Sequence, residues 1–166
     1  YIDVIGKGGH AALPKGRVNP LLIASKIIIA LYDRFDQLKD TPSVFSIGFI
    51  EGGSVGNIIP DTVSLQGTFR AMNEKWRKEA HQIMRDICYS TAQEMSGKCE
   101  IDIKVGYPFL KNDESFTKLC FENAQKFIGA KNVIKIPKRM TAEDFSYYSH
   151  YVPACFYRLG VGINNQ

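Results

Sequence analysis

Alternation of apolar and polar residues predicts four strands in the first two-thirds of the chain. The clearest is residues 63–70, where Val63, Leu65 and Phe69 alternate with polar side chains, the period of a strand with one buried face. Three further stretches alternate in the same way or are rich in β-branched and aromatic residues, namely 1–6, 44–50 and 99–105. Glycine-rich turns follow the first two of these stretches.

Two helices are predicted between the strands. Asn19 and Pro20 begin the first helix, because asparagine caps a helix N-terminus and proline is tolerated in the first turn. Asn73 caps the second helix and Gly97 ends it. The order β-α-β-β-α-β, with half-buried strands and one-sided helices, predicts an α+β fold, the ferredoxin-like sandwich: a four-stranded antiparallel sheet with both helices on one face.

The pattern changes after residue 106. A helix is expected over about residues 113–128, with five apolar side chains directed inward: Phe116, Leu119, Cys120, Ala124 and Phe127. Residues 133–136 and 154–159 are apolar without alternation, which is typical of strands buried on both faces of a parallel sheet. Two such strands cannot form that sheet alone, so we expect an incomplete α/β segment. The predicted domains are therefore residues 1–106 and 107–166.

Composition narrows the classes of function. Of the 166 residues, 45% are hydrophobic and 23% are charged, which is typical of a folded globular protein. The net charge of +4 is small and scattered, so no nucleic-acid partner is expected. No apolar run reaches the roughly 20 residues of a membrane span, so no membrane partner is expected either.

Four cysteines, Cys88, Cys99, Cys120 and Cys155, lie far apart in the sequence, and none is near a histidine. This spacing argues against a zinc site and against a dense disulfide framework. We expect free thiols in a reducing compartment, the cytoplasm, with bridged pairs as the alternative.

No complete metal-binding or catalytic motif occurs in the chain. The histidines form no HxxxH or HxH pair, and the adjacent carboxylates Glu143 and Asp144 are expected to point in different directions. There is no GxSxG motif, and the glycine-rich segment at residues 6–9 lacks the spacing of a phosphate-binding loop. We therefore predict no metal ligands within this chain.

Four residues are candidates for substrate contact, although each also has a structural interpretation. His10 follows two glycines in a loop, where an imidazole can donate a hydrogen bond to an oxyanion or can be a surface turn residue. Arg70 ends a predicted strand on its polar face, where it binds a carboxylate or is solvated. Asn57 fits ordinary turn chemistry, and Glu143 faces a pocket or lies in the first turn of a helix.

Four motifs, taken together and in order, resemble those of one enzyme family. They are GKGGHAALP (residues 6–14), GNIIP (56–60), LQGTFR (65–70) and AEDFSYY (142–148). The chain resembles the metal-dependent amidohydrolases and metallopeptidases that include hippurate hydrolase, N-acyl-amino-acid amidohydrolases and auxin-conjugate hydrolases, relatives of aminoacylase and carboxypeptidase G. The resemblance extends over nearly the whole chain.

The resemblance implies a fragment of a hydrolase that cleaves the amide bond of N-acyl amino acids or small peptides. Residues 1–106 would be its ferredoxin-like lid, which forms a homodimer, and residues 107–166 part of its catalytic α/β domain. His10 would stabilise the oxyanion in the partner subunit's active site, and Asn57, Arg70 and Glu143 would contact the substrate. The family's two divalent metal ions, zinc or manganese, would have ligands before Tyr1 and beyond Gln166, so the fragment alone would bind none and be inactive.

Two positions depart from the family pattern. Lys15 stands where the first motif usually continues with histidine, and Asn19 stands where the family has aspartate. The alternative function is a non-catalytic ferredoxin-like module for ligand sensing or dimerisation. An RNA-binding sheet is disfavoured, because the polar face of residues 64–70 presents no aromatic side chain.

Overall fold

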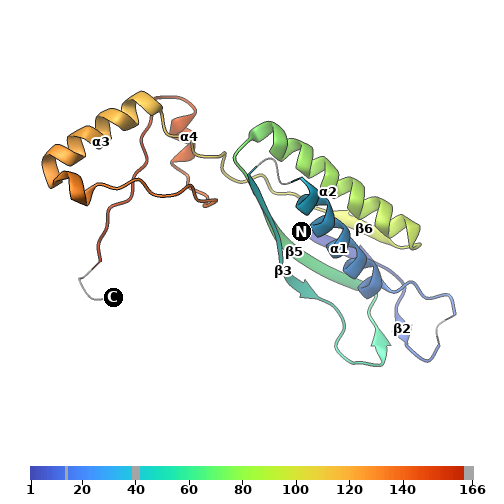
Figure 1. The fold of residues 1–166 in the computed structure, drawn as a ribbon. Coiled ribbons are helices and arrows are strands. Elements are labelled where there is room, and N and C mark those ends of the chain that lie inside the picture. The colour runs from blue at the N-terminus through green and yellow to red at the C-terminus, as the bar shows by residue number, and fades with distance from the viewer. Residues whose placement is uncertain (14, 39–41, 163–166) are drawn as a thin grey trace. The chain divides into compact units, whose positions relative to one another are not determined.

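The computed structural model describes residues 1–13, 15–38 and 42–162. They form two compact units, Tyr1–Val105 and Gly106–Gln166 (Figure 1). Pro14 of the first motif and the last four residues of the predicted second domain lie outside the described residues.

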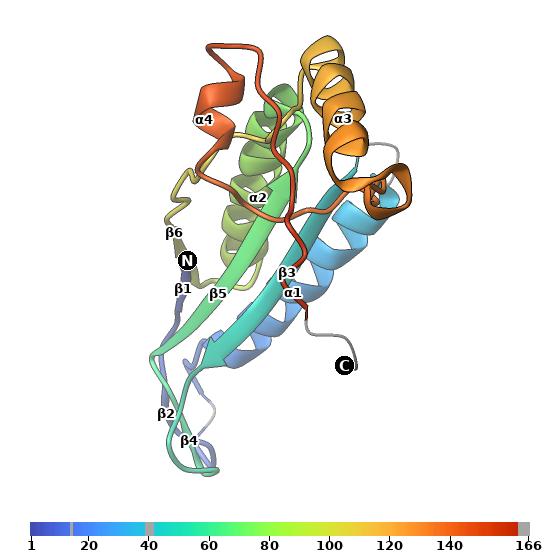
Figure 2. The ribbon, with the colours of Figure 1, turned by 90° about the vertical axis from the view of Figure 1, so that its left-hand side faces the viewer.

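The first unit is built on a four-stranded antiparallel sheet with the strand order β3-β5-β1-β6. Its strands are β1 (Ile2–Ile5), β3 (Ser43–Glu51), β5 (Thr62–Ala71) and β6 (Lys98–Ile101). Helix α1 (Pro20–Gln37) connects β1 to β3, helix α2 (Glu74–Glu94) connects β5 to β6, and both cover the same face of the sheet (Figure 2). The predicted ferredoxin-like sandwich is confirmed, although the last strand ends at Ile101 rather than residue 105.

The core lies between the helices and the two central strands. Val4 of β1 and Val63 and Leu65 of β5 are almost completely buried, and they meet Ile27 and Leu31 of α1. Burying such a side chain stabilises the fold by roughly 1.5–3 kcal/mol. The alternation along β5 is as predicted, because its apolar residues face the helices and its polar residues face away.

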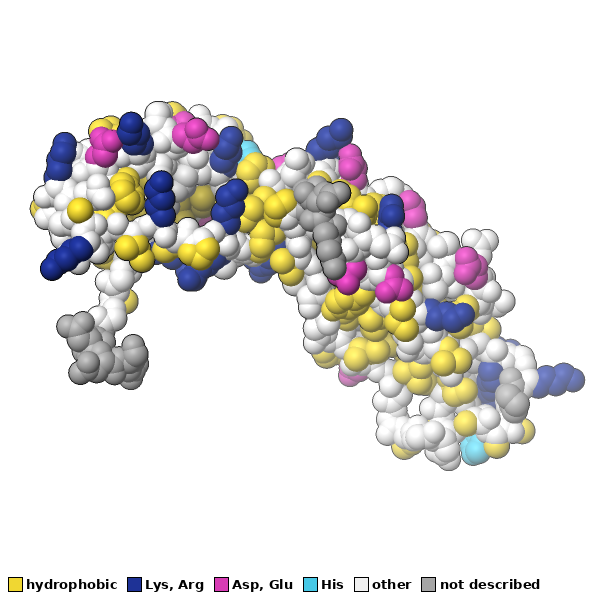
Figure 3. Space-filling model, in the orientation of Figure 1, with side chains coloured by type: hydrophobic (Ala, Val, Ile, Leu, Met, Phe, Trp, Pro, Cys, Tyr) yellow, Lys and Arg dark blue, Asp and Glu magenta, His cyan; other side chains and the backbone are white. Residues whose placement is uncertain are grey.

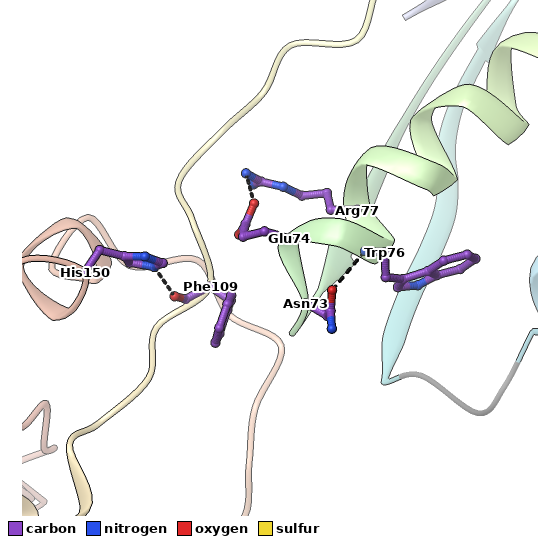
Figure 4. A network of polar contacts seen from close by, with 6 residues as sticks. All are labelled: Asn73, Glu74, Trp76, Arg77, Phe109 and His150. Atoms are coloured by element: carbon purple, nitrogen blue, oxygen red, sulfur yellow. Dashed lines mark hydrogen bonds and ion pairs between the residues drawn. The ribbon is translucent and has the colours of Figure 1, made fainter.

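Asparagine caps begin both helices of the sandwich. The Asn19 side chain accepts a hydrogen bond from the Leu21 amide at 3.0 Å, and the Asn73 side chain accepts one from the Trp76 amide at 2.9 Å (Figure 4). Each cap satisfies a backbone donor that the helix leaves without a partner. Both predicted caps are confirmed.

The second unit contains helix α3 (Glu114–Ile128), a short 3-10 helix η1 (Ala130–Asn132) and helix α4 (Ser146–Ser149). Asp113 caps α3 by accepting from the Phe116 amide at 2.8 Å, and Gly129 ends it. An imidazole nitrogen of His150 lies 3.1 Å from the carbonyl oxygen of Phe109, a contact within this unit that Figure 4 also draws.

Two expectations for this unit are wrong. The predicted strands at residues 133–136 and 154–159 are absent from the described residues 106–162, and none of the five side chains expected inward on α3 is fully buried. Leu119 and Phe127 are 54% and 89% exposed. A strand needs a neighbour to hydrogen-bond with, and none is present among the described residues of this unit. An apolar helix face needs a surface to pack on, and here only Cys120 and Ala124 of the five are half-buried.

All four cysteines are free thiols; Cys88 is buried and the other three are half-buried. Among the described residues, no helix combines the length and apolarity that crossing a membrane requires.

Candidate functional site

His10 and Asn57 meet on a short ribbon that extends from one end of the sheet. The ribbon pairs β2 (Gly9–His10) with β4 (Ile58–Ile59), so that His10 lies opposite Ile58. The Ala11 amide donates to the carbonyl oxygen of Asn57 at 2.9 Å. Two of the four predicted site residues, 47 positions apart in the sequence, are therefore neighbours in space.

Asp61 anchors this ribbon to the sheet. Its carbonyl oxygen accepts from the Gly6 amide and its Oδ1 accepts from the Gly8 amide, both at 2.8 Å. A Cβ atom on Gly8 would overlap the backbone carbonyl of Ile59, so only glycine permits this close approach. The glycine-rich motif thus serves backbone packing. Sequence reasoning missed Asp61; its only signal was its position directly after the GNIIP motif.

The imidazole of His10 is exposed and has a defined donor. Its Nδ1 accepts a hydrogen bond from the Ala12 amide at 3.2 Å. A neutral imidazole whose Nδ1 is an acceptor carries its proton on Nε2. His10 therefore presents an Nε2–H donor that can be directed at a group outside the ribbon.

Arg70 lies near the far end of β5, opposite Val44 of the edge strand β3. Its side chain is half-buried and belongs to the polar face of the sheet, away from the helices. From Thr62 to Arg70 the strand rises by eight residue steps, roughly 26 Å at about 3.3 Å per step. Within one chain, Arg70 is not brought together with His10 and Asn57.

The chain leaves the sandwich at the same end of the sheet as Arg70. Ile2 of β1 lies between Leu65 of β5 and Ile101 of β6, and the Asp102 amide donates to the carbonyl oxygen of Tyr1 at 2.9 Å. The ammonium group of Lys104 lies 4.7 Å from the centre of the Tyr1 ring. The ribbon with His10 is therefore at the opposite end of the sheet from the connection to the second unit.

Glu143 belongs to the second unit and not to the sheet or ribbon. Its Oε1 lies 3.3 Å from Nη2 of Arg158, and its carbonyl oxygen accepts from the Ser146 amide at 3.1 Å, in the turn that leads into α4. Glu143 therefore precedes a short helix, and its carboxylate is already paired with a guanidinium.

The described residues contain no group of three histidine, cysteine, aspartate or glutamate side chains that could hold a metal ion. The residues present therefore do not fit a metal centre by themselves. The ribbon offers an imidazole donor and an amide side chain, and the far end of β5 offers a guanidinium. Each of these groups can form hydrogen bonds to a substrate.

Comparison with known proteins gives a consistent family. Residues 1–96 match the family described as the peptidase dimerisation domain of M20 peptidases. The chain is 34% identical over 158 residues to an N-acetyl-L-cysteine deacetylase of Bacillus subtilis, covering 93% of this chain and 37% of that protein.

Two solved structures agree with this family match. A tripeptidase of Staphylococcus aureus is 29% identical, with a TM-score of 0.74, and the similarity covers 92% of this chain and 40% of that protein. A Bacillus subtilis protein described as a dinuclear metal-binding peptidase of the M20 family shares the fold, with 22% identity and a TM-score of 0.66, over 92% of this chain and 38% of that protein. The chain thus spans about two fifths of the length of these relatives.

Proposed function

The chain belongs to the M20 peptidase dimerisation-domain family, and on that premise we propose that it forms part of a metal-dependent hydrolase that cleaves the amide bond of N-acyl amino acids or small peptides. The relatives named as an N-acetyl-L-cysteine deacetylase and a tripeptidase support this reaction class. The observation that carries the proposal is the placement of His10 and Asn57 on an exposed ribbon, at the sheet end opposite Arg70.

In this proposal His10 stabilises the oxyanion that forms when the amide carbonyl is attacked. Its Nε2–H is the free donor, because Nδ1 is engaged by the Ala12 amide. A preorganised donor of this kind typically raises turnover by 10²–10³-fold, because it stabilises the transition state by roughly 2.7–4 kcal/mol. Asn57 would bind a neighbouring polar group of the substrate from the same ribbon.

His10 would act in the active site of a second copy. The ribbon lies beyond Thr62, which is about 26 Å along β5 from Arg70, so one chain does not bring both residues to one substrate. Two copies related by a two-fold axis can bring the ribbon of one subunit to the Arg70 end of the other. Arg70 would then bind the substrate's carboxylate from its own subunit, and Glu143 would line the pocket.

The surface formed by α1 and β3 is the proposed dimer contact. β3 is an edge strand nine residues long, and exposed apolar side chains lie on it and on the neighbouring helix: Leu22, Ile29, Tyr32, Val44, Phe49 and Ile50. Figure 3 shows apolar side chains gathered over these two elements. An unpaired edge beside exposed apolar residues is suited to pairing with a second copy.

Two divalent metal ions, zinc or manganese, would supply the activated water in the complete enzyme, as the description of one relative as dinuclear supports. Because the described residues do not fit such a centre, this chain would bind and orient the substrate and stabilise the oxyanion. We expect the 166-residue chain alone not to hydrolyse N-acetyl or N-benzoyl amino acids when zinc or manganese is added. Metal-dependent hydrolysis by it would contradict this division of roles.

A non-catalytic module for ligand sensing or dimerisation is the competing function. The hydrolase and the non-catalytic module differ in whether His10 and Arg70 affect turnover. Subunit complementation in the complete enzyme distinguishes these two functions. His10→Ala and Arg70→Ala variants are each purified and then mixed under conditions that exchange subunits. A mixed dimer with sites shared between subunits contains one site with both residues intact, so activity should return to a substantial fraction of the wild-type value.

Lack of recovery in mixed dimers would contradict the shared site, and unchanged turnover in both single variants would favour the non-catalytic module. Lys75→Ala, which removes an exposed charge from α2, is the control for subunit exchange.

A further inference from the structure

We infer that Arg17 is a positioning residue for His10, holding both ends of the turn that orients the imidazole. The functional consequence rests on the proposed role of His10. The arrangement itself lies within one unit of the chain and can be tested without catalysis.

The turn that carries His10 is closed by two hydrogen bonds. The Leu13 amide donates to the carbonyl oxygen of His10 at 2.9 Å, and the Ala12 amide donates to Nδ1 of the same residue at 3.2 Å. The second bond sets the orientation of the ring and leaves Nε2 as the outward donor. Its geometry depends on the backbone of residues 10–13 keeping its present path.

Arg17 contacts the chain on either side of this turn. Its Nε donates to the carbonyl oxygen of Leu13 at 3.1 Å, which holds the end of the turn. Its guanidinium lies against Gly9, at the start of the turn, so closely that a Cβ atom there would overlap it. Gly9 also has a φ of +129°, which favours glycine. Arg17 therefore contacts the chain at Gly9 and at Leu13, on either side of His10.

The remaining interactions of Arg17 do not suggest another role. Its side chain is half-buried, and none of the ion pairs found among the described residues includes it. A lysine has no Nε donor with a planar group beyond it, so it cannot make both contacts at once. The two backbone contacts are thus specific to the guanidinium.

Placement matters for a donor that acts on a transition state. An error of about 1 Å in the position of such a group can lower turnover by about 10²-fold. Arg17 would affect catalysis through the position of His10 and without touching the substrate.

The test is an NMR comparison of the 166-residue chain with Arg17→Ala, Arg17→Lys and the control Lys15→Ala. Lys15 is an exposed cation in the same loop, so its variant removes charge without removing the two contacts. In Arg17→Ala, hydrogen exchange at the Ala12 amide should become about tenfold faster, as expected when a weak hydrogen bond is lost. The ¹⁵N shift of the His10 Nδ1 should move toward that of an imidazole without this bond. Arg17→Lys should show most of both changes, and Lys15→Ala neither.

Unchanged Ala12 exchange and His10 shifts in Arg17→Ala would overturn the inference, as would equal changes in Lys15→Ala. A well-dispersed amide spectrum shows that each variant is folded. If Arg17→Ala is not folded, the Ala12 exchange and the His10 shift in Arg17→Lys test the inference instead. In the complete enzyme, Arg17→Ala should lower kcat about tenfold with little change in KM. If the NMR changes occur but His10→Ala leaves turnover unchanged, the proposed function fails and the positioning role stands.

Discussion

The backbone amide of Gly8 donates a hydrogen bond to Oδ1 of Asp61, 53 positions later in the chain, at 2.8 Å. This bond joins the glycine-rich segment that leads into the ribbon to the residue immediately before β5. Among the described residues, no ion pair includes the Asp61 carboxylate. Its hydrogen-bond donor is therefore the Gly8 amide.

Removing this carboxylate should loosen the ribbon. Asp61→Ala is expected to lower the free energy of unfolding by about 2 kcal/mol, the range for a hydrogen bond to a charged group. Asp61→Asn retains an Oδ1 acceptor and should cost less than half as much. Urea unfolding, with hydrogen exchange at the Gly8 amide, measures both variants. Equal losses in the two variants would show that the bond to Gly8 is not the cause.

The cap of α2 should contribute measurably to the stability of the sandwich. Asn73→Ala removes the acceptor of the Trp76 amide and should lower the free energy of unfolding by about 1 kcal/mol, whereas Asn73→Ser should restore most of it. Trp76 is the only tryptophan in the chain, so its fluorescence during urea unfolding reports on this unit. A serine variant no more stable than the alanine variant would contradict the cap as the source.

His81 should make stability depend on pH. Burial first, and then repulsion by Arg77 and Arg85, lowers the pKa of His81 below its ordinary value of about 6.5. The unfolded chain therefore binds a proton at a higher pH than the folded one. Stability should fall as the pH drops from about 6.5 toward the lowered pKa, with no further loss from this group below it.

The measurement is urea unfolding at a series of pH values. His81→Gln should remove this part of the pH dependence, and Arg85→Gln should reduce it, because one of the two repelling cations is gone. An unchanged slope in His81→Gln would show that other groups cause the dependence.

The α1–β3 surface should control association. Ile29 is 60% exposed although it lies on the same helix as fully buried Ile27, so replacing it changes the surface and leaves the core intact. Ile29→Lys should weaken dimerisation by at least about tenfold, the effect of losing more than about 1.4 kcal/mol at an interface. Sedimentation velocity over a range of concentrations measures this, with Lys75→Ala as the control. A wild-type chain that stays monomeric at high concentration would contradict the proposed contact.

Much of the sandwich could be predicted because its signals are local. The alternation of Val63 and Leu65 with polar neighbours, and the caps at Asn19 and Asn73, depend on residues within a few positions of each other. The order of elements then restricts the topology, since short connections and one buried face leave few arrangements of four strands and two helices.

The second unit was harder to predict because an apolar run in the sequence does not show which residues it will pair or pack with. The Phe156 amide and carbonyl bond to the side chain of Asn112, and the Ala154 carbonyl accepts from the Asp113 amide, so these residues pair with a helix cap instead of a strand. Phe127 has the spacing of an inward residue but is largely exposed. An apolar side chain favours burial, but it is buried only where another part of the protein provides a surface to cover it.

Periodicity, capping and short motifs act over a few residues. The sandwich and the candidates His10, Asn57, Arg70 and Glu143 could therefore be predicted without a structure. The folded chain alone shows that His10 and Asn57 share a ribbon while Arg70 lies at the far end of the same sheet. It also shows that Asp61 holds the glycine-rich segment. These relationships join residues some 50 positions apart, and strand register and backbone hydrogen bonds create them only when the whole sheet has formed.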